Sequence, residues 1–88
     1  MNNKVRKIIA QCAEKHNVRP EMVLGKTRIR SAVAARHEAI YIVRKYLRPR
    51  ADRLSSYSYP NIGRMFGGLD HSTVIHACKK HRERMGAE

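Results

Sequence analysis

The 88-residue sequence has little of what a large enzyme pocket or a membrane span requires. Aromatic residues make up 6% of the chain and tryptophan is absent. Aliphatic side chains must therefore supply most of the core, which is small at this chain length. No apolar run approaches the roughly 18 to 20 residues that cross a bilayer. We expect one small domain over residues 1–88, with neither a large catalytic cavity nor a membrane span.

Cysteine and targeting signals are also scarce. Cys12 and Cys78 are the only cysteines and can form at most one disulfide, so two reduced, mostly buried thiols are expected. The first residues lead into mixed charge instead of the apolar segment of a secretory signal. These features favour a cytoplasmic protein associated with the nucleoid. Met1 and the sequence at the two ends favour a complete small gene product over a fragment.

Acidic residues are few, and this shortage is the strongest compositional signal. Seven Asp and Glu residues face nineteen Lys and Arg residues, which gives a formal charge of +12 and a pI near 10.6. Such an excess goes far beyond what solubility needs and indicates a polyanionic partner. Nucleic acid is the first candidate and an anionic membrane surface is the second.

The periodicity of apolar residues predicts helices throughout the chain. A first amphipathic helix is expected over residues 3–16, ended by Asn17 in a left-handed conformation. A short helix over residues 20–24 begins at Pro20 and stops at Gly25. A long helix over residues 32–47 is capped by Ser31. Its expected inward residues are Val33, Ile40, Tyr41, Val43 and Leu47, and its expected outward residues are Arg36, Arg44 and Lys45.

The last third of the chain predicts a helix-turn-helix over about residues 58–85. Ser58 can cap a helix that reaches about Phe66, with Pro60 in its first turn. Two glycines follow, and Asp70 is a strong N-cap for a final helix that begins near His71. The expected inward face of that helix consists of Val74, Ile75 and Cys78.

Short polar side chains occupy the start of the final helix, which enters the major groove in helix-turn-helix proteins. They are Asp70, His71, Ser72 and Thr73. An Asp can accept from a cytosine amino group, and Ser or Thr can bond bases or phosphates. The alternative is that these residues merely cap a helix. The residues alone leave the two interpretations evenly balanced.

Two further segments are candidates for DNA contact. The loop with Lys26, Arg28 and Arg30 carries no acidic residue, which suits an arm along phosphates or in a narrow minor groove. The alternative is a solvated charged loop. Tyr59 beside Pro60 lies where a DNA backbone or base methyl group can be touched, and a packing role is the equal alternative.

Metal binding and catalysis find weak support. Cys78 and His81 share a helix face, but structural zinc usually needs four ligands in paired short spacings, so no metal or cofactor is expected. Cys78 is better read as a core residue with solvated histidines around it. His37 and Glu38 diverge on their helix, and no phosphate-binding loop or nucleophile motif appears. The chain is not expected to be an enzyme.

Residues 66–80 read Phe-Gly-Gly-Leu-Asp-His-Ser-Thr-Val-Ile-His-Ala-Cys-Lys-Lys. This run closely resembles the signature of the C-terminal DNA-binding domain, domain IV, of the bacterial replication initiator DnaA family, Phe-Gly-Gly-Arg-Asp-His-Thr-Thr-Val-Leu-His-Ala-Cys-Arg-Lys. The resemblance extends upstream through residues 59–63 and 26–31 and covers nearly the whole chain. It implies an all-α fold of about five to six helices, similar to the Trp repressor, in which a long central helix braces the helix-turn-helix.

The resemblance also implies sequence-specific binding to double-stranded DnaA-box sites. Asp70, His71 and Ser72 would lie at the major groove, Thr73 at the backbone and Arg28 in the minor groove. The remaining matched positions are Arg36 and Lys45 on the long helix, and Tyr59 with Pro60 at the start of the helix-turn-helix. His37, next to Arg36, is also a candidate DNA contact, although its residue type differs from the family's. Because family boxes are asymmetric and read by single domains, a monomer is expected, with a dimer through the connection as the alternative.

Several positions depart from the family. Leu69 and Ser72 replace Arg and Thr, Ala35 and His37 replace Pro and Gln, and about seven extra residues lie near positions 48–54. A changed box preference is therefore expected. The initiator's ATPase module is not in these 88 residues. A stand-alone domain can compete with the full initiator, assist it or regulate transcription. The rival functions are an adaptor that docks on the initiator or replisome and a nonspecific nucleoid-associated protein.

Overall fold

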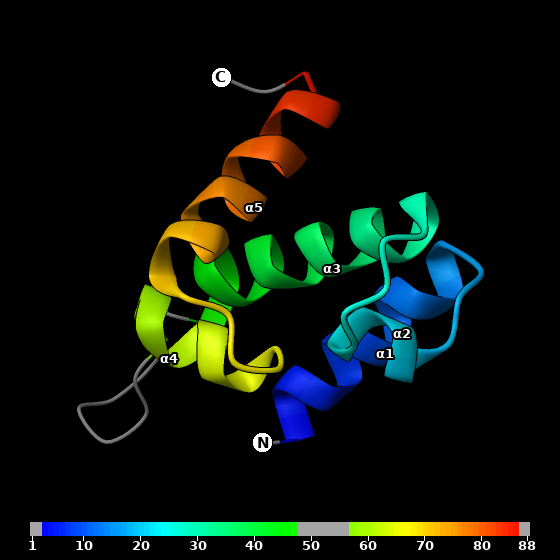
Figure 1. Cartoon of the computed structure of the whole chain (residues 1–88), viewed down its shortest axis with the longest axis horizontal. Helices are drawn as coiled ribbons and strands as arrows, with labels where there is room; N and C mark the ends of the chain where they lie inside the picture. The colour runs from blue at the N-terminus through cyan, green and yellow to red at the C-terminus, as the bar shows by residue number, and fades with distance from the viewer. Residues whose placement is uncertain (1–2, 48–56, 87–88) are drawn as a thin grey trace.

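The computed structural model describes residues 3–47 and 57–86, and within these ranges the chain is helical without strands (Figure 1). The elements in chain order are α1 (Asn3–Lys15), α2 (Pro20–Leu24), α3 (Arg30–Ile42), a π-helical turn η1 (Val43–Leu47), α4 (Tyr59–Met65) and α5 (His71–Arg84). This arrangement confirms the predicted all-α fold. The extra residues near positions 48–54 lie outside the described ranges.

The first two helices follow the sequence pattern closely. Val5, Ile9 and Cys12 are buried on one face of α1. Asn17 has a φ of 57°, the left-handed conformation predicted for the end of this helix. The Val18 backbone N–H donates to the Ala13 carbonyl at 2.9 Å and turns the chain toward α2, which begins at Pro20.

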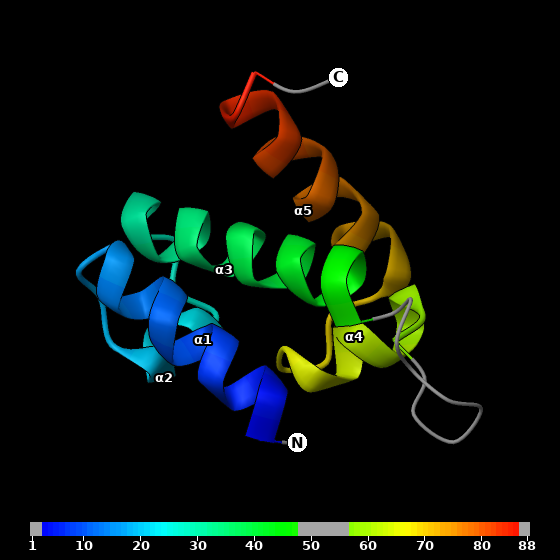
Figure 2. The ribbon, with the colours of Figure 1, turned by 180° about the vertical axis from the view of Figure 1, so that it is seen from behind.

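Helix α3 lies between α1 and α5 and packs against both (Figure 2). Its buried positions Ala32, Ala35 and Ala39 are small and let the neighbouring helices approach closely, while Ile40 fills the core. Glu38 is also buried. Its carboxylate accepts hydrogen bonds from Lys15 Nζ at 2.7 Å and His16 Nε2 at 2.8 Å, which ties α3 to the end of α1.

The start and end of the long helix differ from the prediction. Ser31 is not its cap, because the helix already begins at Arg30 and Ile29 occupies the N-cap position without a side-chain hydrogen bond. The first turn is closed instead by the Val33 backbone N–H, which donates to the Ile29 carbonyl at 2.9 Å. Beyond Ile42 the hydrogen-bond pattern widens into η1, so the predicted stretch to residue 47 is helical but not α-helical throughout.

Candidate nucleic-acid interface

A glycine turn fixes how α5 leaves α4. Gly67 and Gly68 have φ values of 88° and 84°, the left-handed region that glycine adopts without strain. The Gly63 carbonyl accepts hydrogen bonds from the backbone N–H groups of Gly68 and Leu69 at 3.0 and 2.9 Å. A Cβ atom at Gly63 would lie 2.0 Å from the Leu69 carbonyl oxygen. The turn therefore depends on Gly63 as much as on the two glycines that sequence reasoning emphasised.

The first turn of α5 presents polar side chains outward. Asp70 is its N-cap, and Asp70 Oδ1 accepts a hydrogen bond from the Thr73 backbone N–H at 2.8 Å. Hydrogen bonds from the Thr73 backbone and side chain lower the pKa of the Asp70 carboxyl, so it is ionised at neutral pH. His71, Ser72 and Thr73 are exposed, and Val74 directly after them is fully buried. The capping role is thus present, and the same turn remains open to solvent.

The inward face of α5 differs from the prediction at three positions, because Ala77 and His81 are buried and Ile75 is exposed. Ile75 is 44% exposed, whereas His81, expected in solvent, is only 9% exposed. The buried residues follow helical spacing from Val74 through Ala77, Cys78 and His81, and Ile75 lies about 100° away from Val74 around the helix. The His81 ring packs on Tyr41 with a centroid distance of 4.9 Å, and burial lowers the pKa of His81. Packing against α3 therefore selects this face.

Lys26 and Arg28 are exposed in the basic loop between α2 and α3, and Arg30, predicted to lie in this loop, is exposed as the first residue of α3. Arg36, expected to face outward, reaches this loop from α3 and donates hydrogen bonds to main-chain carbonyls, including Gly25 at 2.6 Å and Val23 at 2.7 Å. It is half-buried. Contact between Arg36 and DNA stays a prediction, and the structure gives this residue an internal set of partners that the sequence pattern did not indicate.

His37 and Lys45 occupy other parts of α3 and η1. Arg84 Nη1 lies 2.9 Å from His37 Nδ1, which joins α3 to the last turn of α5. Burial, followed by the positive charge of Arg84, lowers the pKa of His37 to about 4, so the ring is neutral at neutral pH. Lys45 Nζ donates to the Tyr41 hydroxyl at 3.1 Å and is exposed. Neither residue is brought to the first turn of α5 by these contacts.

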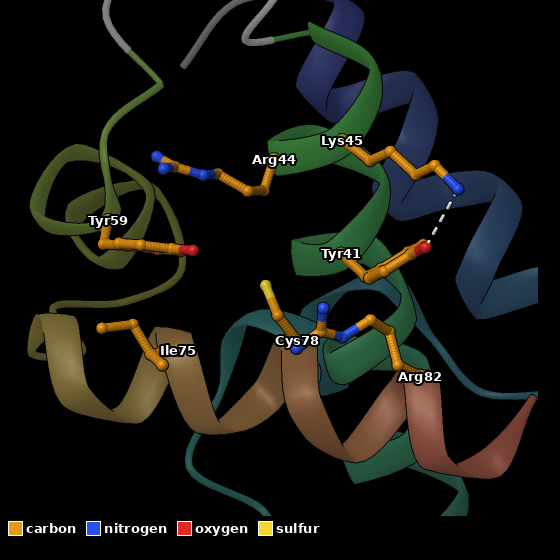
Figure 3. A pocket seen from close by; sticks show the side chains of 7 residues that line it. All are labelled: Tyr41, Arg44, Lys45, Tyr59, Ile75, Cys78 and Arg82. Carbon is orange, nitrogen blue, oxygen red and sulfur yellow. Dashed lines mark hydrogen bonds between the residues drawn. The ribbon is translucent and has the colours of Figure 1, made fainter. Parts of the chain in front are cut away.

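A cavity of about 380 Å³ separates the end of α3 and η1 from α4 and α5 (Figure 3). The Arg44 guanidinium lies over the Tyr59 ring, 3.8 Å from its centroid, and donates to the Tyr57 carbonyl at 3.1 Å. Lys45 points away from Tyr59, toward Tyr41. The full lining is Tyr41, Arg44, Lys45, Tyr59, Ile75, Cys78 and Arg82. Arg44, expected to face outward, is half-buried against Tyr59. The sequence did not indicate this contact, because only packing distinguishes Arg44 from Lys45.

The basic loop and the start of α5 lie on one side of the molecule. Both lie in front of α3 in the view of Figure 1, at opposite ends of that helix. In the reversed view of Figure 2 both lie behind α3, which turns α1 toward the viewer. Tyr59 is half-buried and Pro60 is exposed at the start of α4, next to α5. The loop and the first turn of α5 thus share one side of the molecule, and contact of one ligand with both stays a prediction.

Other kinds of site find no support in the described ranges. Residues 3–47 and 57–86 contain no group of three or more His, Cys, Asp or Glu side chains that could hold a metal ion. Within the same ranges, no helix is long and apolar enough to cross a membrane.

The structure is that of a DNA-binding helix-turn-helix domain. It has the glycine turn, a capped second helix whose first turn is polar and exposed, and a long supporting helix. The chain belongs to the family described as the bacterial DnaA protein helix-turn-helix, which it matches over residues 5–80. It is 38% identical over 82 residues to the chromosomal replication initiator protein DnaA of Cutibacterium acnes. It is 36% identical over 84 residues to that of Cereibacter sphaeroides.

These alignments cover most of this chain and a small part of each relative. They include 93% and 96% of the chain, but only 15% and 17% of the two initiator proteins. A third initiator protein, from Geobacter, is 38% identical over 76 residues, which are 86% of this chain and 15% of that protein. The chain therefore spans about a sixth of the length of these relatives.

Proposed function

We propose that the chain binds double-stranded DNA sequence-specifically, at sites similar to DnaA boxes. The observation that carries this proposal is the first turn of α5, where three exposed polar residues follow the Asp70 cap and precede the buried Val74. The buried side of the helix is fixed by the core, so the polar side has one orientation relative to α4. A rigid, polar helix start of this kind suits the major groove, in which each base pair presents a distinct pattern of donors and acceptors.

Each residue of this turn has a role that fits its chemistry. His71 and Ser72 can bond base edges, and the ionised Asp70 can accept from a cytosine amino group. Thr73 lies beside the cap and is assigned to a phosphate, which the N-terminal end of a helix also attracts. A carboxylate at a DNA-facing helix end opposes binding to phosphates. Asp70 already serves as the cap of α5. On a DNA-facing helix end, base recognition by the same carboxylate would offset this cost, whereas nonspecific binding would not.

The basic loop supplies a second contact on the same side of the molecule. Arg28 is assigned to the minor groove, where narrow segments attract arginine, and Lys26 and Arg30 to the flanking phosphates. Tyr59 and Pro60 contact the backbone or a base methyl group from the start of α4. Arg44, held over Tyr59, adds positive charge beside them, and Lys45 contributes charge from η1.

A fluorescence-anisotropy titration tests this proposal directly. The chain is titrated with a DnaA-box duplex and with a scrambled duplex of equal length at several salt concentrations. We expect a preference for the box of about a hundredfold or more that persists as salt rises, because base contacts are less sensitive to salt than phosphate contacts. Equal affinities that fall together as salt rises would contradict sequence-specific binding.

We infer further that the chain acts on replication initiation by occupying sites that the full-length initiator also uses. The inference is supported by its similarity to initiator proteins, of which it matches one part only. The test measures the binding of a full-length initiator to an origin duplex as this chain is added. Displacement of the initiator would indicate competition, and increased initiator binding would indicate assistance. No effect at concentrations that saturate the boxes would contradict this role.

A further inference from the structure

Arg36 holds the chain segment that connects α2 to the basic loop. Its Nε donates to the Val23 carbonyl at 2.7 Å. Its Nη2 lies within hydrogen-bond distance of three more carbonyls, those of Gly25 at 2.6 Å, Met22 at 3.1 Å and Thr27 at 3.3 Å. One side chain thus joins the middle of α3 to the end of α2 and to the loop residue that precedes Arg28.

These contacts explain how a short, highly charged loop keeps a defined path. The carbonyls at the end of a helix have no partner within that helix and carry partial negative charge, which a cation satisfies. Two further hydrogen bonds of the loop lie at Ile29: its backbone N–H donates to Thr27 Oγ1 at 3.3 Å, and its carbonyl accepts from the Val33 backbone N–H at 2.9 Å. Neither reaches α2 or the first loop residues, which Arg36 does. The path of the loop therefore depends strongly on the Arg36 guanidinium.

We propose that Arg36 is a positioning residue, which fixes the basic loop so that Arg28 reaches the DNA. This inference rests on the proposed function and changes the part that Arg36 has in it. Nε and Nη2 carry most of the N–H groups of a guanidinium, and they are hydrogen-bonded to protein carbonyls. A phosphate that took these donors would have to release the loop that presents Arg28.

The substitution Arg36→Lys separates charge from geometry. A lysine ammonium keeps the charge but is a compact point that lacks the planar fork of arginine, so it cannot reach carbonyls on both α2 and the loop. Arg6→Lys is the matched control, because Arg6 is exposed on α1. Both variants keep the same number of positive charges and the same number of trypsin cleavage sites.

Limited trypsin digestion of the free protein tests the positioning without any DNA. In Arg36→Lys we expect cleavage after Lys26 and Arg28 to accelerate at least fivefold, with cleavage after Lys79 in α5 unchanged. Arg6→Lys should show the wild-type pattern. Unchanged loop cleavage in Arg36→Lys would overturn the proposal, and so would equal acceleration at all sites, which would mean general destabilisation.

A double-mutant cycle on the box duplex then tests whether Arg36 acts through Arg28. We expect Arg36→Lys to weaken box binding at least fivefold in the wild-type background and less than twofold in the Arg28→Ala background. Equal losses in the two backgrounds would show that Arg36 acts independently of Arg28 and would overturn the proposal. If the wild-type chain shows no box preference, the proposed function fails, and the digestion result still decides whether Arg36 positions the loop.

Discussion

His71 and Lys80 lie on the same helix, and we expect them to contact different parts of the DNA, base edges for His71 and a phosphate for Lys80. His71 is exposed in the first turn of α5, where it can reach base edges, whereas Lys80 is exposed two turns further along. We expect His71→Ala to reduce discrimination between box and scrambled duplexes by about 1 to 3 kcal/mol, the range for one good base contact. Anisotropy titrations on both duplexes measure the loss.

Lys80→Ala is the control for this prediction. Loss of one phosphate contact should weaken binding to both duplexes equally and reduce the slope of log affinity against log salt by about 0.9. If His71→Ala also reduced the affinity equally for box and scrambled DNA, His71 in the first turn of α5 would make no base-specific contact.

A second prediction at the residue scale concerns the pH dependence of stability. Burial and the nearby Arg84 lower the pKa of His37 from 6.5 to about 4. Between these values the unfolded chain binds a proton that the folded chain does not, so His37 makes stability fall as pH drops from about 6.5 to 4. We expect His37→Asn to reduce the slope of the free energy of unfolding against pH over this window, measured by urea denaturation. The buried His81, whose pKa is also lowered, contributes to the slope that remains.

His76→Asn is the matched control, because His76 is exposed on α5. It should leave the slope between pH 6.5 and 4 as steep as in the wild type. If His37→Asn leaves the same steep slope, other groups carry the acid sensitivity, and the assignment to His37 is wrong.

At the scale of elements, Glu38 is the polar link between α1 and α3. Burial alone would raise the pKa of its carboxyl, but the hydrogen bonds from Lys15 and His16 outweigh burial and lower it. Because Lys15 is largely exposed, we expect Glu38→Gln to lower the free energy of unfolding by only about 1 to 2 kcal/mol. Urea denaturation at neutral pH measures the change, and Glu14→Gln on the exposed face of α1 should have almost no effect. A loss as small as that of the control would show that the link contributes nothing.

The turn between α4 and α5 gives a sharper prediction. A methyl group at Gly63 would meet the Leu69 carbonyl oxygen at 2.0 Å, whereas one at Gly68 would meet nothing within 4 Å. We expect Gly63→Ala to cost more than about 2 kcal/mol, because α4 and α5 must separate. Gly68→Ala should cost about 1 kcal/mol, from its left-handed backbone alone. Thermal unfolding compares the two variants, and a Gly63→Ala cost no larger than that of Gly68→Ala would contradict this account.

The sequence predicts the features of the fold that depend on neighbouring residues, and it does not predict those that depend on how the helices pack. Local signals were sufficient for the Asp70 cap, the left-handed Asn17 and the glycine turn, since each depends on near neighbours in the chain. The burial of His81 and the exposure of Ile75 depend on how α5 meets α3, which no local pattern contains. Within the candidate site, the contacts of Arg36 also depend on helix packing. Its charge was evident, but its carbonyl partners become adjacent only when α2 packs on α3.

At the scale of the whole molecule, α3 supports both candidate DNA contacts, the basic loop and the first turn of α5. Arg36 in the middle of α3 holds the basic loop, and α3 also packs against α5. The loop and the first turn of α5 are thus carried on one rigid helix, on the same side of the molecule. Under the proposed function, such an arrangement would let a small domain contact two grooves without ordering new structure, which would otherwise reduce the affinity.

The distribution of apolar side chains and charge over the surface predicts the oligomeric state. The large exposed apolar side chains in the described ranges are Ile29, Tyr46, Ile75 and Met85. They belong to the loop before α3, to η1, to α5 and to the residues after α5, so they are distributed over several elements. A net charge of +12 also makes copies repel each other. We therefore expect a monomer of 10.2 kDa in sedimentation velocity and one chain bound per asymmetric box.

Salt provides the decisive comparison for this prediction. Raising the ionic strength to about 0.5 M shortens the range of electrostatic repulsion to a few ångströms. If charge alone kept copies apart, a dimer would form at that salt and two chains would bind each box. If the molecule lacks a self-complementary surface, the monomer persists and the stoichiometry stays at one to one. We expect the second result, because a stable dimer needs a larger continuous apolar surface than these separate side chains provide.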